Sequence, residues 1–176
     1  MKKQFNLKLL KSKKEIAAAV EQLAKKINKD YQHSVPLLIG VLKGSFVFIA
    51  DLIRQLSINL EISFVELSSY ENSRESSGDV KFVKGLDIDI KNRDVLIVED
   101  IIDTGITITS LLNYLEKKNP SSIRICSLTS KPSRRKKEIK IDYLGFKVPN
   151  KFIVGYGLDY KEKYRNLPEI YSLEDE

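Results

Sequence analysis

The chain has little of what cross-links a small protein. Its 176 residues include one cysteine, one methionine, one histidine and no tryptophan. With a single cysteine, Cys126, no disulfide can form within the chain, which indicates a reducing compartment. The apolar neighbours of Cys126 favour a buried and unreactive thiol.

Long apolar stretches are also missing. The first residues, Met1–Phe5, do not open the apolar stretch of a signal peptide. No run approaches the roughly 18 apolar residues that are needed to cross a bilayer. We therefore expect a cytoplasmic protein without membrane contact.

Charge does not decide the function class. The chain has 30 basic and 24 acidic side chains, a formal charge of +6, with a basic concentration at Lys131–Lys137. Such a balance fits nucleic-acid binding, but it fits equally a pocket for a highly anionic small ligand. The length and the apolar content of 42% favour one compact domain over residues 1–176, and we find no internal repeat and no linker.

Strand and helix patterns alternate along the first 130 residues. Ser12 and Glu15 form a predicted capping box before a helix, whose apolar stripe comprises Ile16, Val20, Leu23, Ala24 and Ile27. A second helix is predicted over 46–56 and a third from Ile106 to before Pro120. The predicted strands are 36–41, 58–64, 95–98, 123–128, 141–144 and 152–154. This order predicts an α/β fold with a mostly parallel central sheet flanked by helices.

Residues 95–107 contain the most informative motif. The apolar strand 95–98 leads into Glu99 and Asp100, and ligands of open parallel sheets bind beyond the carboxyl ends of strands. The following segment, Asp103 to Thr107, opens a helix whose free backbone N–H groups and threonine hydroxyls suit a phosphate monoester. Gly105 would allow the close backbone approach that such a cradle needs.

Three carboxylates beside a phosphate cradle would repel a bare anion. They are better explained if they bind sugar hydroxyls, a metal ion or a proton to be moved. The alternative is purely structural, with Asp103 as the N-cap of the next helix. The residues alone leave both interpretations open.

The motif resembles the phosphoribosyl pyrophosphate signature of type I phosphoribosyltransferases, in which two acids and two apolar residues precede Asp-Thr-Gly-x-Thr. Four further segments resemble the hypoxanthine–guanine branch, so that the resemblance spans Leu38 to Pro168. It implies the type I fold, with a small hood formed by the terminal segments. Glu99 is typical of this branch, since xanthine–guanine enzymes often carry two aspartates.

The resemblance implies contacts with phosphoribosyl pyrophosphate. Glu99 and Asp100 would hold the ribose hydroxyls, and 103–107 would wrap the 5-phosphate, with Ile106 where some relatives carry lysine. The Lys43–Gly44 loop would bind pyrophosphate and often has a cis peptide between these two residues. Residues 68–79 lose periodicity and are expected to form a mobile loop or hairpin tip, which would close over the reaction through Ser69 and Tyr70.

The purine would lie between segments near the carboxyl end of the chain. Lys131 would contact the oxygen at C6, Phe152 would stack on the base, and the Ile153 backbone would contact its edge. Asp159 would lie near the base amino group and a second metal ion, and Arg165 would contact pyrophosphate. Read alone, Phe152 could be plain core packing and Lys131 a solvated lysine.

Together these implied substrate-binding residues are Lys43, Gly44, Ser69, Tyr70, Glu99, Asp100, Asp103, Thr104, Gly105, Ile106, Thr107, Lys131, Phe152, Ile153, Asp159 and Arg165. The implied reaction joins hypoxanthine or guanine to phosphoribosyl pyrophosphate in purine salvage. Mg2+ would be held by Glu99, Asp100 and Asp159, and Asp103 would be the general base. Relatives imply a homodimer or homotetramer, and no nucleic-acid partner is expected.

Two other functions stay open. An enzyme that also accepts xanthine is the closer one, and no residue here forces that choice. A regulator that binds RNA or DNA would rest on the +6 charge and on Arg134–Lys137, which we otherwise interpret as solvated surface.

Overall fold

The computed structural model describes residues 5–69 and 80–175. The predicted mobile loop therefore lies mostly outside the described residues. In chain order the elements are β1 (Phe5–Lys11), α1 (Lys13–Asp30), β2 (Leu37–Leu42), α2 (Phe46–Ile53), β3 (Glu61–Ser69), β4 (Val80–Lys84), β5 (Asp94–Ile102), α3 (Ile106–Glu116), β6 (Ser122–Ser130), the short 3-10 turn η1 (Pro132–Arg134), β7 (Tyr143–Lys147), β8 (Ile153–Val154) and β9 (Ile170–Asp175).

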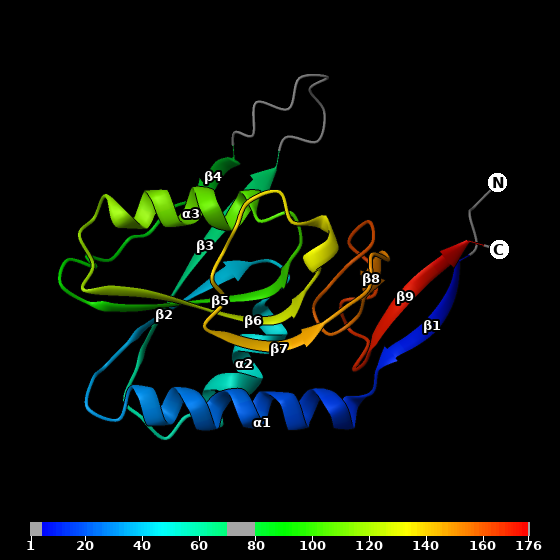
Figure 1. The fold of residues 1–176 in the computed structure, drawn as a ribbon, viewed down its shortest axis with the longest axis horizontal. Helices are drawn as coiled ribbons and strands as arrows, with labels where there is room; N and C mark the ends of the chain where they lie inside the picture. The colour runs from blue at the N-terminus through cyan, green and yellow to red at the C-terminus, as the bar shows by residue number, and fades with distance from the viewer. Residues whose placement is uncertain (1–4, 70–79, 176) are drawn as a thin grey trace.

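The larger sheet has six strands in the order β4-β3-β2-β5-β6-β7. Only β3 and β4 pair antiparallel, and the other neighbours are parallel. Helices α1 and α2 cover one face and α3 covers the other (Figure 1), which gives the sheet one apolar cluster on each side. The predicted mostly parallel α/β sheet is confirmed. Within the described residues, none of the helices is both long and apolar enough to cross a membrane.

Helix α1 begins at the predicted capping box. The Ser12 side chain accepts from the backbone N–H of Glu15, and the Glu15 carboxylate accepts from the backbone N–H of Ser12 at 2.9 Å. The bond from the Ser12 backbone, with those from the side chains of Lys11 and Ser12, lowers the pKa of Glu15 to about 2. All five residues of the predicted apolar stripe are buried, so α1 packs on the sheet as the spacing indicates.

Several element bounds differ from the prediction. Helix α2 ends at Ile53, three residues early, and β3 begins only at Glu61. Strand β5 continues past the two acids to Ile102, because β6 runs beside it as far as Ser130. Glu99 therefore lies within the strand, opposite Ser127, and not beyond its end.

A second sheet is built mainly from the two ends of the chain. Strands β1 and β9 pair antiparallel, and β9 also pairs with the short β8. Figure 1 shows this hood beside the carboxyl ends of β6 and β7. A hood of terminal segments agrees with what the resemblance implies, and it lies beside the carboxyl edge of the main sheet.

Candidate active site

A cavity of about 300 Å³ lies between the carboxyl edge of the main sheet and the hood. Residues Ile101 and Leu158 line it although the sequence did not indicate them; both are direct neighbours of predicted residues, which is the signal that could have found them. The remaining lining residues were all predicted: Lys43, Gly44, Asp100, Asp103, Lys131, Phe152, Ile153, Asp159 and Arg165. Segments more than 120 positions apart in the sequence thus meet in one small space.

The other predicted residues lie elsewhere. Glu99 does not line this cavity, nor do Thr104, Gly105, Ile106 and Thr107, which lead into and begin α3. Ser69 is the last residue of β3, and Tyr70 lies outside the described residues.

Glu99 and Asp100 are buried side by side, with 9% and 5% of their surface exposed. Burial raises the pKa of Glu99 well above its usual range, and the neighbouring Asp100 charge raises it further. Burial also raises the pKa of Asp100, against hydrogen bonds such as the one from the Ile101 N–H at 2.9 Å. Among the described residues, Glu99 Oε2 has no hydrogen-bond partner. Such a pair is costly unless a cation or a hydroxyl donor compensates it.

The segment before α3 turns sharply at Gly105, and the Ile106 N–H donates to Thr104 Oγ1 at 3.4 Å. Gly105 is the N-cap residue with φ 86°, and the Thr109 hydroxyl donates to its carbonyl at 2.9 Å. A Cβ at Gly105 would lie 2.7 Å from Ile139 Cδ1 and 3.1 Å from the Lys137 carbonyl oxygen. Both the left-handed backbone and the close packing therefore require glycine here. The structural alternative, with Asp103 as the N-cap, is wrong.

The Asp103 carboxylate faces two cations. Its Oδ2 lies 3.5 Å from Lys131 Nζ, and its Oδ1 lies 2.8 Å from Arg134 Nε. Lys131 is 5% exposed, and this burial lowers the pKa of its ammonium while Asp103 opposes the shift. The interpretation of Lys131 as a solvated lysine is therefore wrong.

The basic run after Lys131 also differs from the expected solvated surface. Arg134 contacts Asp103, and Arg135 Nη2 donates to Ser130 Oγ at 2.6 Å. Only Lys136 and Lys137 of this run keep exposed side chains without a described contact. The long arginine side chains reach back to the sheet because the turn η1 folds this run toward the end of β6.

The loop after β2 is packed against Asp100. A Cβ at Gly44 would lie 1.9 Å from Asp100 Oδ2, so that only glycine fits beside this carboxylate. The cis peptide bond joins Leu42 to Lys43, and the expectation of a cis bond between Lys43 and Gly44 is wrong. No proline marks the cis bond in the sequence, which is why the residue pattern could not locate it.

The last segment supplies an exposed aromatic ring and an ion pair. Phe152 is 53% exposed and meets the Tyr160 ring edge-on at 5.5 Å, so it is not plain core packing. Arg165 Nη2 lies 2.9 Å from Asp159 Oδ1, and its Nη1 donates to the Gly157 carbonyl at 2.9 Å. A flat aromatic face, three cations (Lys43, Lys131 and Arg165) and three carboxylates thus surround the cavity, a set that suits a planar base and an anionic sugar.

The comparison with known sequences decides the family. Residues 7–161 match the family model of the phosphoribosyl transferase domain. The chain belongs to the phosphoribosyltransferase family.

Individual relatives agree over nearly the whole length. A hypoxanthine-guanine phosphoribosyltransferase of Bacillus subtilis is 50% identical over 163 residues, which is 93% of this chain and 91% of that protein. A hypoxanthine phosphoribosyltransferase of Buchnera aphidicola is 49% identical over 166 residues, 93% of this chain and 94% of that one. A crystal structure of a hypoxanthine-guanine phosphoribosyltransferase of Bacillus anthracis, with a HEPES molecule in its active site, superposes with a TM-score of 0.92 at 42% identity, covering 97% of this chain and 100% of that one.

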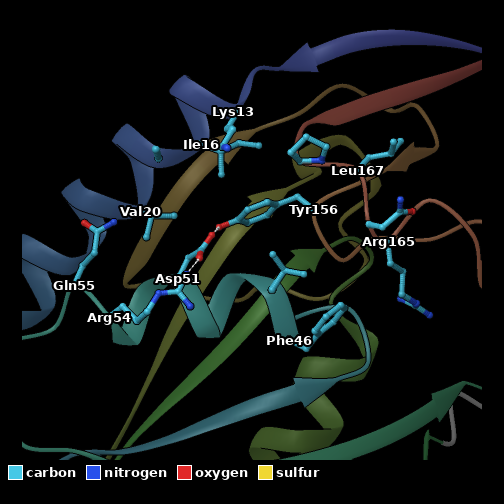
Figure 2. A pocket seen from close by; sticks show the side chains of 14 residues that line it. Lys13, Ile16, Val20, Phe46, Asp51, Arg54, Gln55, Tyr156, Arg165 and Leu167 are labelled. Carbon is cyan, nitrogen blue, oxygen red and sulfur yellow. Dashed lines mark hydrogen bonds and ion pairs between the residues drawn. The ribbon is translucent and has the colours of Figure 1, made fainter.

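In this phosphoribosyltransferase the segment 155–157 contacts α2 and the Lys43–Gly44 loop, and the sequence did not predict these contacts. Gly155, Tyr156 and Gly157 have consecutive φ values of 96°, 52° and 98°, and a Cβ at Gly157 would lie 2.2 Å from the Gly44 carbonyl oxygen. The Tyr156 hydroxyl donates to Asp51 Oδ2 at 2.6 Å (Figure 2). The sequence signal for this turn was the pair of glycines on either side of Tyr156, because glycine readily adopts a positive φ.

These contacts border a larger cleft. It measures about 790 Å³, lies between α1, α2 and the hood segment, and shares Arg165 with the smaller cavity. Figure 2 shows Tyr156 pointing across it toward Asp51 and Arg54. The smaller cavity and this cleft thus lie on either side of the segment that carries Arg165.

Proposed function

We propose that the chain transfers the 5-phosphoribosyl group from phosphoribosyl pyrophosphate to N9 of hypoxanthine or guanine. The products would be IMP or GMP and pyrophosphate, and the role would be purine salvage. The observation that carries the proposal is the meeting of Asp103, Lys131 and the half-exposed ring of Phe152 in one cavity. The names of the Bacillus subtilis and Bacillus anthracis relatives support the choice of base.

The purine is proposed to stack on Phe152, with its edge on the Ile153 backbone. Lys131 would donate to the C6 oxygen, which favours a 6-oxopurine over adenine, whose 6-amino group is itself a donor. Asp159 would lie near the base amino group. The burial of Lys131 strengthens this preference, because a buried cation gains more from an acceptor than a solvated one does.

The sugar and its phosphates are proposed to lie along the carboxyl edge of the sheet. Glu99 and Asp100 would accept from the ribose hydroxyls. The segment Asp103, Thr104, Gly105, Ile106 and Thr107 would bind the 5-phosphate through N–H and hydroxyl donors at the start of α3. The pyrophosphate would lie on Lys43, Gly44 and Arg165, with Ser69 and Tyr70 covering the site.

The chemistry would be a displacement at C1 of the ribose with inversion. The bond from C1 to the pyrophosphate oxygen breaks as N9 attacks, through a loose transition state for which positioning and electrostatics supply most of the catalysis. Asp103 would take the proton from N7 as the new bond forms. Its carboxylate lines the cavity and contacts Lys131 and Arg134. This position would allow it to accept a proton from N7 of a purine that is bound at Lys131.

Mg2+ is proposed as the cofactor, held by Glu99, Asp100 and Asp159. In the described residues no three His, Cys, Asp or Glu side chains gather as a ready-made site. Mg2+ nevertheless fits the donors, because it is commonly bound by one or two carboxylates completed by water and substrate phosphate. The unpartnered buried oxygen of Glu99 supports a cationic or hydroxyl ligand at this pair. When bound, the ion would neutralise the leaving pyrophosphate.

The deciding experiment is a steady-state assay with phosphoribosyl pyrophosphate and Mg2+, comparing hypoxanthine, guanine, xanthine and adenine. We expect nucleotide formation from the first two bases. Chelating the metal should abolish this activity, and added Mg2+ should restore it. Turnover of xanthine at a similar rate would establish the broader specificity. No turnover with any base would overturn the proposal, and nucleic-acid binding at graded salt would then test the regulator.

We also propose that residues 1–176 form one domain that acts in the cytoplasm as a homodimer or homotetramer. One apolar cluster contains Ile16 of α1, Phe48 of α2 and Ile170 of the hood, which supports a single domain. Phe46 is 45% exposed next to the Lys43–Gly44 loop and lines the larger cleft, which supports a subunit contact there.

Sedimentation velocity tests the assembly. We expect a species larger than 20.2 kDa that Phe46→Ser shifts toward the monomer, while Val83→Ser leaves it unchanged. Val83 is a suitable control because it is also an exposed apolar side chain but lies in β4, away from the cleft. A wild-type monomer at micromolar concentration would contradict the proposal.

A further inference from the structure

We propose that Arg134 is a positioning residue that holds the Asp103 carboxylate in the orientation needed for proton transfer. The inference rests on the proposed function, in which Asp103 accepts the N7 proton. Arg134 belongs to the basic run that neither the motif nor the implied ligand contacts explain. Its position beside Asp103 indicates a role in orienting that carboxylate.

The two oxygens of Asp103 have different partners. Arg134 Nε lies 2.8 Å from Oδ1, whereas Lys131 Nζ lies 3.5 Å from Oδ2. The attraction between unlike charges weakens with distance, so the arginine makes the closer of the two contacts. Oδ1 accepts no hydrogen bond from the described residues, so the charge of Arg134 is its nearest compensation, whereas Oδ2 has the more distant Lys131.

The Lys131 ammonium cannot bind the Asp103 carboxylate and the C6 oxygen of the purine equally strongly at the same time. In the proposed complex its ammonium turns to the C6 oxygen of the purine, which lies beside the N7 position that Asp103 faces. Asp103 must then keep its orientation without its lysine contact. Arg134 is the cation that can remain on Oδ1 while Oδ2 receives the proton from N7.

Arg134 projects from a well-held turn. The turn η1 closes with the Arg134 N–H on the Lys131 carbonyl at 3.1 Å. The next residues are tied to the phosphate segment, since the N–H groups of Lys136 and Lys137 donate to the Thr104 carbonyl at 2.9 and 3.3 Å. The guanidinium of Arg134 is therefore carried by backbone that is fixed relative to Asp103.

The simplest alternative is an ordinary surface ion pair. The Arg134 side chain is 48% exposed, and such pairs contribute little to stability. That alternative predicts variants with unchanged turnover. The positioning role predicts a loss of turnover with little change in thermal stability, because small displacements of a catalytic group cost much more in rate than in folding.

The experiment combines three variants with the wild type and with Asp103→Asn. Arg134→Gln removes the cation, Arg134→Lys keeps a charge without the planar guanidinium, and Lys136→Gln removes a neighbouring exposed charge as the matched control. Steady-state kcat and KM for hypoxanthine and for phosphoribosyl pyrophosphate are measured, with thermal unfolding of each variant. The slow turnover of variants that carry Asp103→Asn is measured with a sensitive product assay.

We expect Arg134→Gln to lower kcat about tenfold with an unchanged KM for phosphoribosyl pyrophosphate, Arg134→Lys to recover part of the loss, and Lys136→Gln to behave as the wild type. In the Asp103→Asn background, Arg134→Gln should have no further effect. The same fold loss in both backgrounds, or equal behaviour of Arg134→Gln and Lys136→Gln, would overturn the inference. An inactive wild type would instead refute the proposed function, so the two failures are distinguishable.

Discussion

Replacing Asp103 by asparagine lowers turnover by about 10²–10⁴-fold, the usual contribution of a general base, while nucleotide binding changes little. Asparagine has nearly the shape of aspartate but no carboxylate to accept the N7 proton. The contacts of the neighbouring backbone do not depend on this side chain, since Gly105 and not Asp103 caps α3. The loss should therefore appear in kcat.

The measurement pairs kcat with the affinity for IMP, determined by titration calorimetry. Asp89→Asn is the control, because it removes the same formal charge from an exposed carboxylate that does not line the cavity. Turnover of Asp103→Asn equal to that of the control would remove Asp103 from the role of base. An equal loss of IMP affinity and of kcat would make it a binding residue.

Replacing Gly157 by alanine destabilises the fold by about 2–4 kcal/mol, the sum expected for a left-handed non-glycine residue and for overpacking. The backbone at Gly157 has φ 98°, and the new Cβ would lie 2.2 Å from the Gly44 carbonyl oxygen. A backbone atom cannot move aside as a side chain can. The Lys43–Gly44 loop and the hood segment would have to separate, so kcat/KM should fall with stability.

Denaturant unfolding measures the loss of stability, and the same preparations are assayed for turnover. Gly85→Ala is the matched control, because Gly85 has no left-handed φ and its new Cβ would meet only a side chain, that of Tyr114, with the hydroxyl oxygen at 3.0 Å and Cζ at 3.8 Å. For this control we expect a change within about 1 kcal/mol. If Gly157→Ala unfolds at the same denaturant concentration as Gly85→Ala, the close packing of the two loops is not what holds the site.

Much of the fold follows from local patterns. The capping box and the apolar stripe of α1 are predicted because both depend on residues within one or two turns of a helix. The buried run 95–98 and the strand-to-helix order predict the parallel sheet in the same way. The ends of elements are less well predicted, as β5 shows, since its last residues are strand only because β6 extends beside them.

The sequence by itself predicted most of the residues that line the cavity: the Lys43–Gly44 loop, Asp100, Asp103, Lys131 and four residues within 152–165. Only the tertiary structure decided how their side chains pair. Tyr156 and Asp51 are 105 positions apart, and Arg134 and Asp103 meet across two strand ends. A local pattern reports how one segment is buried, whereas these contacts depend on how distant segments pack. That is why Arg134 resembles solvated surface in the sequence and contacts the Asp103 carboxylate in the fold.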